Sequence, residues 1–192
     1  VVLGPLLTLI IFNPKKPQKE LKTDLSVIFA LQMAALIWGI FTVYQQRIVA
    51  TVFFENDFAT VSAIELSSQN YPLEQLQEFS KASPALIYFD KPRSNEGIKK
   101  LIDKFEKDGI SPLHQTEFYR SLTDNFDKIL PLQINIDASI KANPELSSQL
   151  NKLLASSNFQ KSDLKYFSLK AKYQDMILAF NVKGEQVGYL TP

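Results

Sequence analysis

The chain has 192 residues, with 21 basic and 20 acidic side chains and no cysteine. A charge this close to neutral argues against a nucleic-acid-binding domain, which is usually clearly basic. The lack of cysteine excludes disulfides, thiolate catalysis and zinc–thiolate sites, but it leaves the cellular compartment open.

An apolar segment opens the chain and covers residues 1–12, where Thr8 is the only polar side chain. The segment is too short to cross a membrane, because a transmembrane helix needs about 20 residues. Its start at Val1 lacks the positive region and cleavage site of a signal peptide. We therefore expect residues 1–12 to be the C-terminal part of a transmembrane helix that begins upstream.

A second apolar segment covers residues 25–44 and carries no charged side chain. Its length suits a hydrocarbon core about 30 Å thick, and Tyr44 fits an aromatic anchor at the interface. The alternative is a buried helix of a soluble protein, but so long a charge-free run is typical of membrane spans. This segment predicts a transmembrane helix over residues 25–44.

The loop between the two segments, residues 13–24, is rich in lysine, whereas the first basic residue after the second segment is Arg47. The four loop lysines are Lys15, Lys16, Lys19 and Lys22. Basic loops are retained in the cytoplasm, so these lysines predict a cytoplasmic loop and an exported domain over residues 45–192. A solvated turn, or contact with anionic headgroups, is compatible with the same topology.

Three residues of the second segment are candidates for contact with another helix. Gln32 is a polar side chain near the middle of the span, and Ala35 and Gly39 form a pair of small residues four apart. Polar and small residues at this spacing favour close helix packing in membranes. The partner helix is either the chain's own first segment or a helix of another protein.

The exported part predicts an α+β domain with a largely antiparallel sheet and three to four helices. Its first half reads as a hairpin over residues 48–64 with a turn at Asn56-Asp57, a short helix after Pro72, and a buried strand over residues 85–89. The spacing of Ile98, Leu101, Ile102 and Phe105 predicts an amphipathic helix closed by Gly109. The strand and helix over residues 86–109 also fit a βα unit of an inert thioredoxin-like fold.

The second half of the domain continues with helices and then strands. Phe118, Leu122, Phe126 and Ile129 predict a helix that stops before Pro131, and the leucines of residues 146–154 predict another. Apolar alternation then predicts strands over residues 166–173, 176–182 and 186–190.

No catalytic motif is found in the chain. It has no phosphate-binding glycine loop, no G-x-S-x-G, no H-E-x-x-H and no calcium loop. His114 is the only histidine, and Asp103 with Lys107 has the spacing of a surface pair on a helix. We therefore expect no enzymatic activity and no catalytic, cofactor or metal site.

Several motifs occur together in the first sixty or so residues: the apolar stretch Gly4–Phe12, the lysine-rich loop, Leu21 with Asp24-Leu25, Leu31-Gln32, Ala35-Leu36, Thr42-Val43-Tyr44 with Arg47, and the strand Val52–Glu55. Together with the C-terminal stretch from Tyr166-Phe167 to Val187-Gly188, they resemble the TfpX/TfpZ family of type IV pilin accessory proteins, and the resemblance covers essentially the whole chain. The chain departs from the family at Ile48, where a proline is frequent, and at Asn56-Asp57-Phe58. These departures leave the topology unaffected.

The resemblance implies a multi-pass protein of the bacterial inner membrane with its C-terminal domain in the periplasm. Its implied role is to support the stability, maturation or assembly of a type IV major pilin, which would be its partner alongside the lipid bilayer. The alternative is a membrane-anchored periplasmic sensor domain that binds a ligand. The sequence leaves the oligomeric state open.

Overall fold

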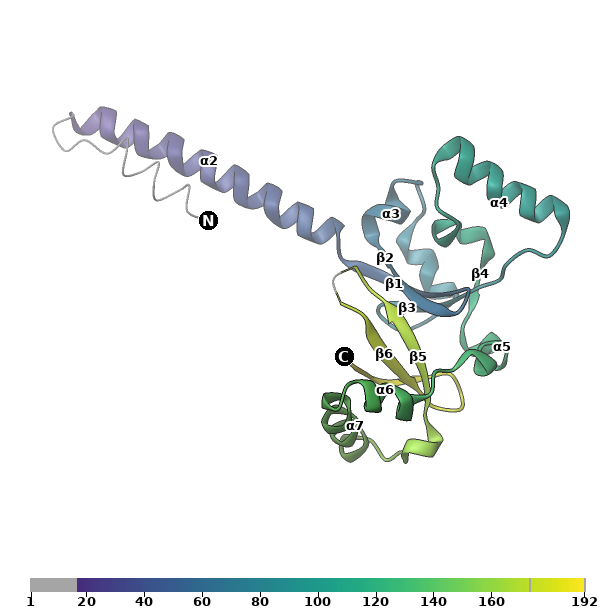
Figure 1. The fold of residues 1–192 in the computed structure, drawn as a ribbon. Helices are drawn as coiled ribbons and strands as arrows, with labels where there is room; N and C mark the ends of the chain where they lie inside the picture. The colour runs from purple at the N-terminus through teal and green to yellow at the C-terminus, as the bar shows by residue number, and fades with distance from the viewer. Residues whose placement is uncertain (1–16, 173, 192) are drawn as a thin grey trace. The chain divides into compact units, whose positions relative to one another are not determined.

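The structure is a computed structural model that describes residues 17–172 and 174–191. The chain divides into two compact units, Val1–Arg47 and Ile48–Pro192. The first unit contains helix α2, and the second contains the sheet and the remaining helices (Figure 1).

Helix α2 spans Gln18–Gln45 without interruption. It starts earlier than predicted, because residues 18–24 belong to the helix and not to the loop expected over residues 13–24. These residues are mostly good helix formers, and Glu20 lies in the first turn, where the helix dipole favours a negative charge. The predicted helix over residues 1–12 and the start of the loop lie outside the described residues.

The second unit is built on a seven-stranded sheet with the order β4-β3-β1-β2-β5-β6-β7. The strands are β1 Ile48–Phe54, β2 Asp57–Ser62, β3 Ala85–Phe89, β4 Tyr119–Ser121, β5 Lys165–Lys170, β6 Met176–Phe180 and β7 Gln186–Leu190. Neighbouring strands are antiparallel except for two pairs, β1 with β3 and β2 with β5. The predicted α+β class with a largely antiparallel sheet is confirmed.

Helices lie in the connections from β2 to β3, from β3 to β4 and from β4 to β5. The α-helices are α3 Ala63–Ser67, α4 Asn95–Asp108, α5 Phe126–Ile129, α6 Ile136–Ala142 and α7 Glu145–Ser156. The 3₁₀ helices are η1 Leu73–Glu78, η2 Pro112–His114, η3 Thr116–Phe118, η4 Thr123–Asn125, η5 Leu130–Leu132 and η6 Lys161–Asp163. The predicted βα unit is present as β3 followed by α4.

The predicted hairpin is formed by β1 and β2, with its turn one residue earlier than expected. Phe54 pairs with Asp57, so Glu55 and Asn56 make the turn. Strand β1 lies between β2 and β3, and its apolar run is buried from Ala50 to Phe53. A strand inside a sheet that is covered on both faces reads as a continuous apolar run, which explains this part of the sequence.

The helix predicted from Phe118 to Ile129 is largely wrong. Residues Tyr119–Ser121 form the edge strand β4, and only Phe126–Ile129 is α-helical. Tyr119 is fully buried, pairs with Phe89 of β3 and donates a hydrogen bond from its hydroxyl to the Leu113 carbonyl at 2.7 Å. These long-range contacts override the helical spacing.

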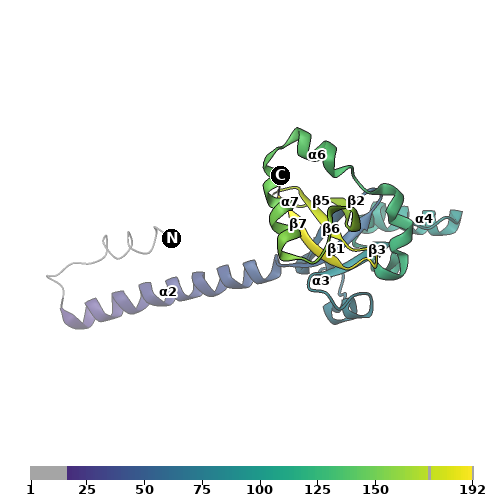
Figure 2. The same cartoon turned by 90° about the horizontal axis from the view of Figure 1, so that it is seen from below.

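The domain core follows the sheet as three clusters of buried side chains. One cluster joins β1, β3 and β4 to α3 and η1, and another joins β5, β6 and β7 to α6 and α7. Figure 2 shows α7 beside β7, in agreement with their contacts. Between them lies a group that we call the phenylalanine cluster: Phe53, Phe58, Phe126, Phe167 and Phe180.

Candidate functional site

The most unusual surface of the described chain is the apolar side-chain surface of α2. Nearly all of this helix is exposed, and Trp38 and Val43 each expose 73% of their surface. Its 28 residues extend about 42 Å, which exceeds the thickness of the hydrocarbon core. The helix is therefore long and apolar enough to span a membrane or to act as a signal anchor, and it is the one described helix with these properties.

The structure brings the three predicted contact residues onto one face of α2. Ala35 and Gly39 follow Gln32 by three and seven residues, which are the spacings of neighbours on a helix surface. All three are exposed. A Cβ atom built on Gly39 would have no other atom within 4 Å, so the helix backbone is open to close approach there. Contact of this face with another helix stays a prediction.

Of the four lysines expected to set the topology, Lys19 and Lys22 lie exposed near the N-terminal end of α2. Lys15 and Lys16 lie outside the described residues. At the opposite end, the Arg47 guanidinium lies 3.8 Å from the centre of the Tyr44 ring and donates a hydrogen bond to the Tyr44 carbonyl at 2.8 Å. This contact satisfies a terminal carbonyl of the helix and places a cation where the helix dipole favours it.

Sequence reasoning missed this interaction between Tyr44 and Arg47. Their spacing of three residues was the available signal, because it places an aromatic ring and a cation side by side at a helix end. The contact lies at the C-terminal end of α2, just before β1.

His114, the only histidine, lies between two structural elements of the domain. Its Nε2 atom is 3.8 Å from Oε2 of Glu65, and the Glu65 carboxylate accepts hydrogen bonds from the Ser62 backbone and hydroxyl at the start of α3. Burial lowers the pKa of His114, and the nearby Glu65 charge opposes that shift. These contacts connect η2 to α3. Within residues 17–172 and 174–191, no three His, Asp or Glu side chains are grouped to hold a metal ion.

A hollow of about 560 Å³ is lined by β7 and the turn before it, together with residues of β3 and of the segments that precede β3 and follow β4. Its lining is Phe79, Ser80, Ala82, Ser83, Pro84, Leu86, Leu122, Thr123, Gly184, Glu185, Gln186, Val187, Gly188 and Tyr189. Glu185 is the single charged residue in this lining, and its carboxylate accepts a hydrogen bond from the Asn181 amide at 2.7 Å. The hollow therefore presents mainly uncharged surface.

Comparison with curated proteins finds similarity to fimbrial assembly proteins of Dichelobacter nodosus. The serogroup E1 and serogroup I proteins are each 30% identical over 112 residues, covering 55% of this chain and 44% of theirs. The protein of serogroups C1 and C2 is 47% identical over 53 residues, covering 28% of this chain and 40% of its own. The matches thus span less than half the length of these relatives.

The other two comparisons find nothing similar. No protein-family model matches the chain, and no solved structure matches it.

Proposed function

We propose that the chain belongs to a non-enzymatic accessory protein of the bacterial inner membrane that supports the stability, maturation or assembly of a type IV major pilin. The observation that carries this proposal is the similarity to three proteins named for fimbrial assembly. The exposed apolar helix α2 supports the membrane location. In this proposal α2 spans the inner membrane after an earlier span, and residues 45–192 lie in the periplasm.

The proposed mechanism uses the face of α2 that carries Gln32, Ala35 and Gly39. A pilin subunit waiting in the membrane is held there by one apolar helix, which can lie parallel to α2. Small residues let two helix backbones approach closely, and a polar side chain in a span adds a hydrogen bond worth about 1 kcal/mol. The periplasmic domain then covers pilin surface until the subunit enters the fibre.

The proposed orientation of α2, with its N-terminal end in the cytoplasm, predicts opposite results for two reporter fusions. A reporter placed after Lys16 is expected to lie in the cytoplasm, and one placed after Asn70 is expected to lie in the periplasm. Asn70 is an exposed turn residue with φ 57°, so an insertion there leaves the strands intact. Paired alkaline phosphatase and green fluorescent protein fusions measure the two locations. The proposed topology is wrong if both fusions report the same side.

Replacing Gly39 by isoleucine is expected to reduce co-purification of the pilin about tenfold, with a matching loss of surface pili. The added side chain holds the two backbones apart, which removes the packing that drives helix association in lipid. Gln32→Leu is expected to have a smaller effect, since it removes one hydrogen bond. The measurement is pilin recovered with the tagged, membrane-extracted protein.

The matched control for Gly39→Ile is Ala30→Ile. Ala30 is also small and exposed, but it lies nine residues before Gly39 and so on the opposite face of α2. We expect this variant to keep normal pilin recovery. Normal piliation in both Gly39→Ile and Gln32→Leu, at normal protein levels, would rule out the helix contact.

A further inference from the structure

Helix α4 leaves most of the apolar face predicted by its sequence pattern exposed. Ile98, Ile102 and Phe105 expose 39%, 44% and 54% of their surfaces, and we call these three residues the α4 stripe. No residue of α4 is buried. The stripe is a continuous apolar surface, because its residues are four and three positions apart.

The α4 helix is held to the domain by a different side. Leu101 packs partly buried against the core, and its carbonyl accepts a hydrogen bond from the Gln115 amide at 2.9 Å. Lys104 forms an ion pair with Glu117 at 2.6 Å. These contacts fix the helix in place and leave the α4 stripe facing away from the core. Exposed apolar surface of this kind marks interaction sites in soluble domains.

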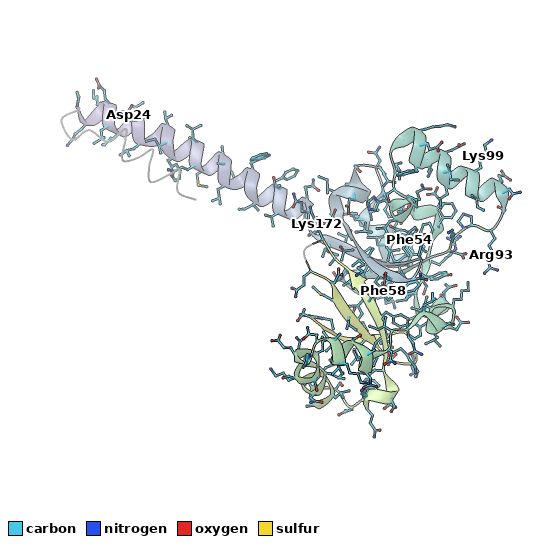
Figure 3. The ribbon with its side chains drawn as sticks, in the orientation of Figure 1. Asp24, Phe54, Phe58, Arg93, Lys99 and Lys172 are labelled. Carbon is cyan, nitrogen blue, oxygen red and sulfur yellow. The ribbon has the colours of Figure 1, made fainter. Side chains whose placement is uncertain are left out.

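Two charged residues flank the stripe on the side away from Leu101. Lys99 and Glu106 are seven residues apart, and both are exposed. Neither has an ion-pair partner among the described residues, whereas Lys104 and Lys107 are paired with Glu117 and Asp103. Figure 3 shows Lys99 on α4 and Phe58 in the sheet. Lys99 and Glu106 are therefore available to a partner that binds the stripe.

The positions of the stripe residues and of Lys99 and Glu106 along α4 indicate which partner fits this surface. In heptad terms, Ile98, Ile102 and Phe105 occupy d, a and d, and Lys99 and Glu106 occupy the two e positions. When two copies of such a helix pair antiparallel, the e positions of one face those of the other. Lys99 then meets Glu106 of the second copy, and the two-fold axis repeats the pair. In a parallel arrangement Glu106 would instead face the position of Leu101, and no ion pair would form.

We propose that α4 is a self-association surface, at which two copies of this chain pair antiparallel through the α4 stripe. Ile102 packs against Phe105 of the second copy on each side of the axis. A self-complementary surface of this type is what a two-fold symmetric dimer requires. The proposal goes beyond the pilin contact of α2, since it uses a different helix and a different partner.

The size of the surface sets the strength of the association. Helix α4 has 14 residues and is about 21 Å long, so a pair of such helices buries less than the roughly 1,200 Å² of a stable interface. Association in dilute solution is therefore weak. Anchoring both copies in one membrane raises their effective concentration, and this gain rests on the proposed span of α2.

A charge exchange on the full chain tests the proposal. Because the chain has no cysteine, Lys152→Cys on the exposed side of α7 gives a single site for a fluorescent label. Energy transfer between labelled copies in lipid vesicles then measures their association. Lys99→Glu or Glu106→Lys alone turns both symmetry-related ion pairs of the dimer into pairs of like charges. Each single variant is therefore expected to weaken association about tenfold. The double variant Lys99→Glu/Glu106→Lys restores opposite charges and is expected to restore association.

Two further variants complete the test. Lys141→Glu makes the same charge change on the exposed surface of α6 and is expected to leave energy transfer unchanged, and Ile102→Ser is expected to abolish it. Failure of the double variant to recover, or unchanged transfer in both single variants, overturns the proposal and indicates lipid or another protein as the occupant. Co-flotation with vesicles tests the α2 span separately. If the chain does not co-float, the same charge-exchange variants are compared by sedimentation in solution at high protein concentration, where weak association is detectable.

Discussion

Replacing Phe58 by alanine is expected to lower the free energy of unfolding of the domain by about 3–5 kcal/mol. Phe58 is fully buried in the phenylalanine cluster. Its ring lies 5.0 Å from that of Phe53 and 5.3 Å from that of Phe180, measured between ring centres. Each such aromatic pair adds roughly 0.5–1.5 kcal/mol to the apolar burial.

The surrounding structure cannot relax enough to fill the cavity that Phe58→Ala leaves. The surrounding rings come from β1, β5, β6 and α5, and the strands are fixed by their hydrogen-bonded neighbours on the sheet. A cavity whose walls cannot relax carries the larger cost within the expected range. Denaturant unfolding of the full chain in mild detergent, followed by circular dichroism, measures the loss.

The control for this prediction is Phe159→Ala. Phe159 lies outside the phenylalanine cluster and keeps 37% of its surface exposed. Its truncation removes the same atoms but leaves no closed cavity, so we expect a loss below about 1 kcal/mol. Similar losses for Phe58→Ala and Phe159→Ala would show that the phenylalanine cluster does not stabilise the domain as described.

Replacing Gly184 by alanine is expected to destabilise the domain by roughly 2–4 kcal/mol. Gly184 has φ 78° in the turn between β6 and β7, a conformation that a Cβ atom makes costly. That atom would also lie 2.8 Å from Cγ of Phe126. Phe126 belongs to the phenylalanine cluster, so its displacement would disturb the packed core. The same unfolding experiment measures this loss.

Gly109 provides a matched comparison for Gly184. It has φ 69° at the C-cap of α4, and a Cβ atom there would have no other atom within 4 Å. Gly109→Ala therefore carries only the conformational cost, roughly 1–2 kcal/mol. If the two alanine variants lose the same stability, the contact with Phe126 has no energetic importance.

Several elements follow from local sequence alone. The run of residues 25–44 determines an apolar helix, because none of its side chains is charged and few are polar. The spacing of Ile98, Leu101, Ile102 and Phe105 predicted α4, and Gly109 ends that helix in a left-handed conformation. The face of α2 that carries Gln32, Ala35 and Gly39 follows from helix geometry, so the candidate site could be placed before its surroundings were known.

Other features depend on residues far apart in the chain and appear only in the tertiary structure. Tyr119 is in a strand because it pairs with Phe89, although the spacing around it is helical. The parallel pairing of β2 with β5 joins Phe58 to Leu169, and no local pattern encodes that choice. For α4, the sequence alone determined an amphipathic helix. The tertiary structure decided that Leu101 faces the core and that the α4 stripe stays open, because the direction of a helix face is set by what packs against it.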